Sequence, residues 1–313
     1  MPIHTILALT DFSIQAEQAL DRAALLAVTH QARLRILYAS DTPPLQLADP
    51  YARLEQRARQ LARRHSVPVT AVSGSGQPMA DAMAEIDRAD LLVVHHNMHR
   101  GPFWRRSTLS RLLQRSPCPV LVVRQPAQAA YAQVLVAVDF SATSRPQVRY
   151  ASSFAPGAAL DVFHAIDTGT EAWMRRVQAD APTVQAYRRE VQAQAQDQMF
   201  SLSDSFDTRR NRVGTLVGRG CLARHLEVQQ ECVSADLLVV GQPRRAPWVD
   251  ALWGSVARKL LGLGLGCDLL LLPQNRQALS REHREQALAA FGIRSVRVTL
   301  RTPAAPDDRR HTL

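Results

Sequence analysis

Several features are scarce in this 313-residue chain, and each scarcity argues against a class of protein. No apolar run approaches the roughly 20 residues that a membrane-spanning helix needs, so we expect no membrane segment. The start, MPIHTILALTDFS, has no basic region followed by a long apolar stretch, which argues against a signal peptide. The four cysteines never form a CxxC pair, which favours reduced thiols in a cytoplasmic protein over a disulfide scaffold or a zinc site.

Common catalytic and phosphate-binding motifs are also missing. The chain contains no GxSxG elbow, no GxxxxGK(S/T) phosphate loop and no GxGxxG after a strand pattern. The GLGLG run at 262–266 precedes an apolar strand pattern, so we interpret it as a turn that ends a helix. The residues therefore point away from the common hydrolase, kinase and dehydrogenase classes.

Lysine is nearly absent, because only Lys259 stands among the 38 basic residues that give a net charge of +10. An arginine-rich surface can attract phosphates or nucleic acid. The arginines here are scattered and lack interleaved aromatic residues, which favours a solvated surface and makes nucleic acid an unlikely partner. One alternative stays open, in which residues 275–313 (8 basic minus 4 acidic, net +4) bind nucleic acid in a salt-dependent way.

The chain does contain a long internal repeat. Three stretches recur at offsets of 128, 146 and 149 residues: TILALTDFS as VLVAVDFSA, RADLLVV as SADLLVV, and CPVLVV as CDLLLL. They place Asp11 over Asp139, Asp90 over Asp236, and Cys118 over Cys267. A repeat of this length indicates a duplicated domain, which we call copy one (residues 1–125) and copy two (residues 132–273).

Short apolar runs alternate with helical patterns in each copy. Continuous apolar strands between helices predict a parallel sheet covered on both faces, and right-handed crossovers then give a doubly wound α/β domain of five strands, used twice. The growth in offset predicts a longer helix in copy two, from about residue 170 to residue 200. Residues 275–313 predict a basic extension with a short helix beginning at Ser280 and a half-buried strand at 293–301.

Two loops converge on one crevice in each predicted domain, because ligands of open parallel sheets bind outside the carboxyl ends of the strands. Asp11 and Asp139 end the first strands, and the loops after the fourth strands begin at residues 95 and 241. Gly241 and the Gly254-Ser255 helix start suit a close approach of backbone to phosphate. The alternative is ordinary turn chemistry for the glycines and helix capping for the two aspartates.

The copy-one loop, HHNMHRGPFWRRS, begins with a cluster of histidine and methionine: His95, His96, Met98 and His99. Such side chains suit copper or nickel, but no cysteine or carboxylate within the loop completes a ligand shell. Adjacent His95 and His96 also point apart if the strand continues through them. We therefore predict a loop without metal.

Together these features resemble the universal stress protein family in its tandem form. The resemblance rests on DFS after the first strand, ADLLVVG at the fourth, Gly-Ser at the last helix and CPVLVV at the fifth, and it covers both copies but not the tail. ATP-binding members carry a Gly-x-x-Gly-x9-Gly-(Ser/Thr) loop and an aspartate after strand one. Copy two matches at Asp139, Gly241, Gly254 and Ser255, with Arg244 at the middle glycine. In copy one the three glycines become His95, Met98 and Arg106, the loop is two residues shorter, and only Asp11 and Ser107 remain.

The resemblance implies a stress-associated regulatory or binding protein with at most weak ATP hydrolysis. Copy two is the candidate site for ATP with magnesium, whereas side chains at the glycine positions of copy one take the space of the ligand. The alternative is a degenerate scaffold that binds no nucleotide and acts through protein contacts or another ligand. The family pairs its fifth strands antiparallel, so 119–123 and 268–272 are expected to join the copies as an intrachain pseudo-dimer. The strand at 293–301 could extend a sheet or join two chains as a homodimer.

Overall fold

The computed structural model describes residues 2–40, 49–75, 77–99, 112–113, 115–204, 213–243 and 256–274. The predicted helix and strand of the C-terminal extension lie outside these residues. Within the part of the chain that is described, no helix is long and apolar enough to span a bilayer.

All ten strands that we predict within the two copies are present, five in each copy. The elements of copy one are β1 (Thr5–Thr10), α1 (Ile14–His30), β2 (Arg33–Tyr38), α2 (Pro50–His65), β3 (Val69–Val72), α3 (Pro78–Ile86), β4 (Leu91–His95), a 3-10 turn η1 (His96–His99) and β5 (Val120–Val123). The elements of copy two are β6 (Gln133–Ala137), α5 (Ser144–Phe154), β7 (Ala159–Ile166), α6 (Gly169–Arg176), α7 (Ala181–Asp204), β8 (Val213–Arg219), α8 (Leu222–Cys232), β9 (Leu237–Pro243), α10 (Val256–Gly262) and β10 (Asp268–Gln274).

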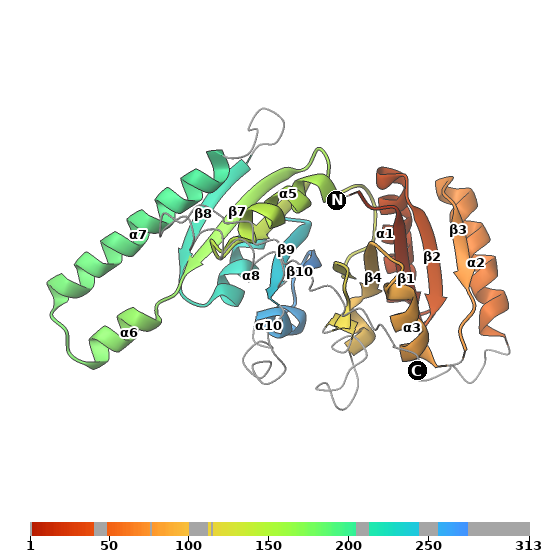
Figure 1. Ribbon diagram of the computed structural model, residues 1–313, viewed down its shortest axis with the longest axis horizontal. Helices are drawn as coiled ribbons and strands as arrows, with labels where there is room; N and C mark the ends of the chain where they lie inside the picture. Colours follow the sequence, from red (N-terminus) through yellow and green to blue (C-terminus); the bar gives the residue numbers. More distant parts are fainter. Residues whose placement is uncertain are drawn as a thin grey trace, which may run out of the picture. The chain divides into compact units, whose positions relative to one another are not determined.

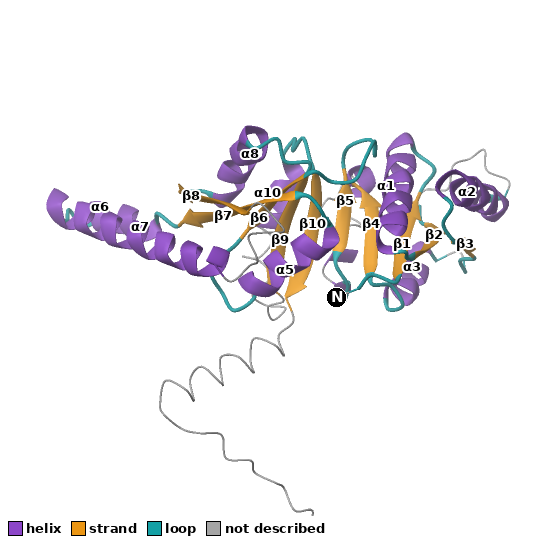
Figure 2. Cartoon of the chain, turned by 90° about the horizontal axis from the view of Figure 1, so that it is seen from above, coloured by secondary structure: helices purple, strands orange, loops and turns teal. Residues whose placement is uncertain are grey.

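The ten strands form one sheet in the order β3-β2-β1-β4-β5-β10-β9-β6-β7-β8 (Figures 1 and 2). Strands within each copy are parallel, and β5 pairs antiparallel with β10. The predicted intrachain pairing of the fifth strands is therefore confirmed. Because the strand direction reverses at this pair, the carboxyl ends of the two sets of strands lie at opposite edges of the sheet.

Helices cover both faces of the sheet, as continuous apolar strands require (Figure 2). One apolar cluster joins one sheet face to α1, α2, α5 and α7, and a second joins the other face to α3, α8 and α10. Both clusters run across the boundary between the copies, so each face of the sheet has one core that the two copies share.

Local signals explain where the elements begin. The Ser13 side chain accepts a hydrogen bond from Ala16 N and caps α1, and Asp49 accepts from Tyr51 N and Ala52 N at the start of α2. The repeated aspartates before the fourth strands have one shared role. Asp90 accepts from two amides at the start of β1, and Asp236 accepts from two amides at the start of β6.

The longer connection in copy two differs from the prediction. The extra residues do not form one helix over about 170–200, because α6 ends at Arg176 and α7 begins at Ala181. The chain turns at Gln178, whose φ of 55° lies in the left-handed region. Copy two therefore carries an additional helix, α6, which lies beside α7 (Figure 1).

Candidate functional site

Both copies end their first strand in the same tight turn. Phe12 has a φ of 62° and Phe140 a φ of 58°, in the left-handed region that a bulky side chain rarely adopts. In copy one, Phe12 N donates a 3.0 Å hydrogen bond to Thr10 Oγ1 and so stabilises the turn. The turn sets the preceding aspartate of each copy at the carboxyl edge of the sheet, where the sequence places it.

In copy one, Asp11 stabilises this turn, and Ser13 caps the helix α1 that follows. Asp11 Oδ1 accepts from Ser13 N at 2.9 Å, while the Ser13 hydroxyl accepts from Ala16 N at 3.2 Å. The alternative reading of Asp11 as a helix cap is therefore wrong in detail, because the helix cap lies two residues further along the chain.

His95 fills the space beside Asp11. It is the last residue of β4, its side chain is almost fully buried, and its Nε2 lies 3.4 Å from Asp11 Oδ2. This is an ion-pair distance rather than a well-aligned hydrogen bond, since neither His95 ring nitrogen meets hydrogen-bond geometry with a described residue. Burial alone would raise the pKa of the Asp11 carboxyl, but His95 and Ser13 together hold that pKa well below its ordinary value.

The equivalent aspartate of copy two has different partners. Asp139 Oδ1 accepts from Ser141 N at 3.0 Å, from Ser141 Oγ at 2.6 Å and from Ser144 Oγ at 3.1 Å. Gly241 occupies the strand position of His95, because it pairs with Leu272 of β10 as His95 pairs with Val123 of β5. No side chain therefore reaches Asp139 from this position.

Gly241 lies inside a strand and does not follow one. We expected the loop to begin at Gly241, but β9 continues to Pro243, because Gln242 and Pro243 extend the parallel ladder along β10. In copy one the ladder stops at His95, and the 3-10 turn begins at His96.

An aromatic pair lies next to the turn in each copy, and sequence reasoning missed both pairs. The ring of Phe12 stacks on Tyr38, with centroids 5.0 Å apart, and the ring of Phe140 packs on His164 at 4.1 Å. His164 Nδ1 donates to Val138 O at 2.9 Å, which fixes the orientation of the imidazole. The available signal was the phenylalanine that follows the aspartate in both DFS stretches.

These aromatic pairs border two open pockets. The pocket of copy two has a volume of about 230 Å³ and lies between the ends of β6 and β7 and the helix α7. Residues that line it include Phe140, His164, Asp167, Tyr187, Gln194 and Gln198. The pocket of copy one, about 330 Å³, lies between α1 and α2 and is lined by Phe12, Glu17, Arg53, Gln56, Arg57 and Gln60. There the Arg53 guanidinium lies 4.7 Å from the centre of the Phe12 ring.

Part of the predicted phosphate loops lies outside the described residues. This applies to Arg106 and Ser107 in copy one and to Arg244, Gly254 and Ser255 in copy two. Met98 belongs to the 3-10 turn His96–His99. The structure thus brings Asp11 together with His95, and it places Asp139 just after β6 and Gly241 inside the neighbouring strand β9.

Comparison with known proteins gives a consistent result. The Universal stress protein family matches the chain twice, over residues 2–124 and 130–273. A universal stress protein from Thermus aquaticus, encoded beside a sulfhydrylase gene, is 31% identical over 135 residues, which is 38% of this chain and 98% of that protein.

Solved structures agree on the fold. A functionally unknown protein from Pseudomonas aeruginosa PAO1 has a TM-score of 0.61 at 20% identity, covering 92% of this chain and 98% of its own. A universal stress protein from Archaeoglobus fulgidus has a TM-score of 0.60 at 13% identity, covering 87% of this chain and 97% of its own. Both are similar to the chain along most of its length, so the tandem arrangement is shared.

Proposed function

Because this chain belongs to the universal stress protein family in both of its copies, we propose that it is a stress-associated regulatory protein that binds a nucleotide in copy two only. ATP with magnesium is the candidate ligand. The protein would bind and regulate, with at most slow ATP hydrolysis, because its sequence contains no motif that places a catalytic base beside the phosphate loop.

The contrast between Gly241 and His95 carries this proposal. His95 is buried against Asp11, so its ring occupies the space that a ligand would need between the first and fourth strands of copy one. Gly241, at the matching position of copy two, places no side chain of its own in that space. A phosphate can approach backbone amides only where no Cβ stands in the way, so copy two suits a nucleotide better than copy one.

The copy-two pocket provides for the rest of the ligand. Phe140 and His164 offer aromatic surface to a base, while Gln194 and Gln198 offer amide donors and acceptors. Asp139 uses only Oδ1 for its hydrogen bonds to Ser141 and Ser144, which leaves Oδ2 as an acceptor for a ribose hydroxyl. In this proposal Gly254, Ser255 and Arg244 complete the phosphate side, Arg244 through a charge-assisted bond.

A thermal shift with ATP and magnesium tests the proposal. At an ATP concentration one hundred times the Kd, mass action adds about 2.7 kcal/mol, which raises Tm by roughly 5–10 °C. The matched control is ATP with the variant Asp139→Ala, which should shift far less. An unchanged Tm of the wild-type chain at millimolar ATP and magnesium would rule nucleotide binding out.

The second candidate function is a scaffold that acts through protein contacts. Trp173 in α6 and Val177 just after it are 60% and 53% exposed. Exposed apolar side chains of this size are common in binding surfaces. This second function would be favoured if ATP leaves the Tm of the chain unchanged and if a protein that co-purifies with the wild-type chain is absent from the Trp173→Ala preparation.

A further inference from the structure

The strands that join the two copies do not by themselves determine which copy pairs with which. Leu121 of β5 lies opposite Leu270 of β10, and these two residues occupy equivalent positions in the repeat. Their neighbours, Val120 and Val122 on one side and Leu269 and Leu271 on the other, are all apolar and buried. A β5–β5 or β10–β10 pair in the same antiparallel register would therefore bring together side chains of the same kind.

A buried charged cluster beside this strand pair is not symmetric. Asp268, at the start of β10, is fully buried and lies 3.2 Å from the Nε of Arg22, which belongs to α1 of copy one. Tyr131, in the connection between the copies, donates a 2.6 Å hydrogen bond to Asp268 Oδ2, and Arg124 N donates to Oδ1 at 2.8 Å. Arg22 also donates to Ala129 O at 2.7 Å. The cluster thus needs Arg22 from copy one, Asp268 from copy two and the connection between them.

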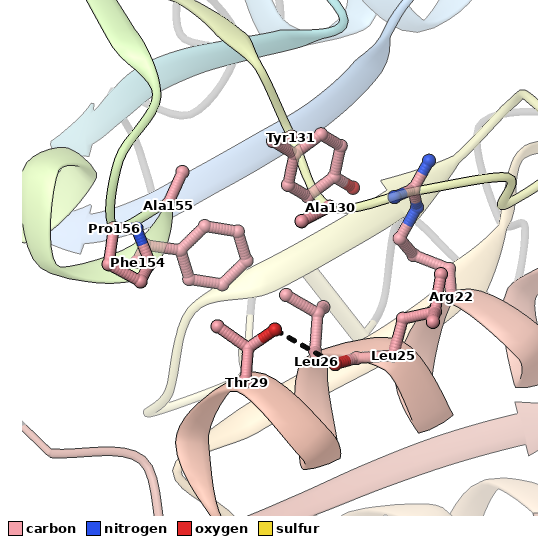
Figure 3. A pocket seen from close by; sticks show the side chains of 9 residues that line it. All are labelled: Arg22, Leu25, Leu26, Thr29, Ala130, Tyr131, Phe154, Ala155 and Pro156. Carbon is pink, nitrogen blue, oxygen red and sulfur yellow. Dashed lines mark hydrogen bonds between the residues drawn. The ribbon is translucent and has the colours of Figure 1, made fainter. Parts of the chain in front are cut away.

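Apolar side chains surround this cluster. The Arg22 guanidinium lies 4.2 Å from the centre of the Tyr131 ring, and Leu25, Leu26 and Phe154 lie nearby (Figure 3). The cavity between them measures only about 20 Å³, enough for about one water molecule. Burial raises the pKa of the Asp268 carboxyl, and its hydrogen bonds and Arg22 act against that rise.

The equivalent positions in the repeat hold uncharged residues. Tyr150 follows Asp139 by 150 − 139 = 11 residues, as Arg22 follows Asp11 by 22 − 11 = 11. Pro119 follows Cys118 as Asp268 follows Cys267. Burial raises the pKa of the Tyr150 hydroxyl, and Cys118 contributes to the rise. That hydroxyl has no hydrogen-bond partner among the described residues.

We propose that Arg22 and Asp268 make the pairing face of copy one complementary to the pairing face of copy two. The same two charges oppose the pairing of two identical faces from different chains. A pair of two copy-two faces would set each Asp268 against Tyr150 and bury two carboxylates without a cation. A pair of two copy-one faces would set each Arg22 against Pro119 and bury two unpaired guanidinium groups. Burying a charge without its partner is strongly unfavourable, so the partner that fits the copy-two face is a copy-one face carrying an arginine at this position.

Freeing one face in the full-length chain tests this selectivity. Leu121→Asp places a carboxylate opposite Leu270 and weakens the pairing of the copies, which exposes the copy-two face. The Leu121→Asp chain should remain a monomer of 34.7 kDa by light scattering, because Asp268 opposes self-pairing. Leu121→Asp with Asp268→Asn should form dimers of about twice that mass, because the substituted amide has the shape of the carboxylate without its charge.

The mirror pair serves if Leu121→Asp precipitates. Leu270→Asp frees the copy-one face. The chain with this substitution alone should be a monomer, because Arg22 opposes self-pairing, and the chain that also carries Arg22→Met should form dimers. In either pair of variants, removing the charged residue should change the mass from monomer to dimer. An equal mass for the two variants of the measured pair would overturn the proposal.

A double-mutant cycle in the otherwise unaltered chain gives an independent measurement. Arg22→Met or Asp268→Asn alone should lower Tm by roughly 10 °C, and the double variant should be more stable than the worse single variant, since no unpaired charge remains buried. Additive losses of Tm would show that the two residues do not act as a pair, and would overturn the proposal. Leu54→Ala, a buried change in copy one away from the strand pair, is the matched control, and it should lower Tm without changing the mass.

Discussion

The two crevices occupy equivalent places in the repeat, and one strand position separates them most clearly. In copy one, His95 ends β4 and lies beside Asp11, whereas in copy two Gly241 leaves Asp139 to the hydroxyls of Ser141 and Ser144. The turn, the left-handed phenylalanine and the aromatic pair are common to both. The two copies thus share the framework of the turn, while copy one has an internal contact between His95 and Asp11 at the position where copy two has a glycine.

Importing the copy-one residue into copy two should have the largest effect. Gly241→His places an imidazole next to Asp139, so the proposed nucleotide loses the space for its phosphates. We expect at least a hundredfold weaker ATP binding, seen as loss of the thermal shift and in equilibrium dialysis. A variant that binds ATP as tightly as the wild type would show that this position does not distinguish the copies.

The reverse exchange should not create a site. His95→Gly removes the ring, but the loop that follows is still two residues shorter and still carries Met98 and Arg106. We expect no second equivalent of bound ATP in a titration. Two equivalents would mean that the histidine alone closes copy one.

The next largest effect is a difference in how much Asp11 and Asp139 contribute to the free energy of unfolding. Asp11→Asn removes the charge that faces His95, and we expect a loss of about 1–2 kcal/mol in the free energy of unfolding at pH 7. Asp139→Asn retains the Oδ1 acceptor and should cost less than about 0.5 kcal/mol. Urea unfolding of the three chains measures both values.

The stability contributed by Asp11 should also depend on pH. Its pKa is lower in the folded chain than in the unfolded chain, where it is about 3.9. The contribution is therefore fully present above about pH 4 and is lost as the pH falls through the folded pKa. The gap between wild type and Asp11→Asn should narrow from pH 5 to pH 3, and a constant gap would contradict the contact with His95.

The smallest expected difference concerns the first turns of α1 and α5. Ser13→Ala removes a side-chain cap and should cost about 1 kcal/mol. Thr143 makes no cap hydrogen bond to α5, and its Oγ1 lies 2.8 Å from Ser141 Oγ, so Thr143→Ala should cost less. Equal losses in urea unfolding would show that capping does not distinguish the copies.

Much of the fold could be predicted from the sequence because it rests on local patterns. A short apolar run such as LLVV at 91–94, placed between helical patterns, favours a strand covered on both faces, and the same run recurs in the second copy. The two apolar edges indicated that the fifth strands need covering, and the resemblance to the family supplied the antiparallel pairing of β5 with β10. Local patterns of this kind can be recognised in the sequence before any contact between distant residues is known.

Details that depend on distant contacts were harder to predict. The break between α6 and α7 is an exception, because Asp180 accepts a hydrogen bond from Thr183 N and Pro182 lies in the first turn of α7, which is a local signal that the sequence analysis missed. The extension of β9 past Gly241 depends on the length of β10. Arg22 and Asp268 interrupt otherwise apolar patterns in α1 and β10, and that interruption was the available sign of a buried pair.

Joining the two sheets has a consequence for aggregation. Two separate five-stranded sheets would present four edge strands, and the apolar β5 and β10 would be the most adhesive of them. Pairing these two with each other leaves β3, four residues long, and β8, seven residues long, as the edges of the described sheet. Two copies that separated after a cut in the connection at 124–132 would each expose one of these hidden edges, so the β5–β10 pair and the apolar clusters across it also protect the chain from aggregation.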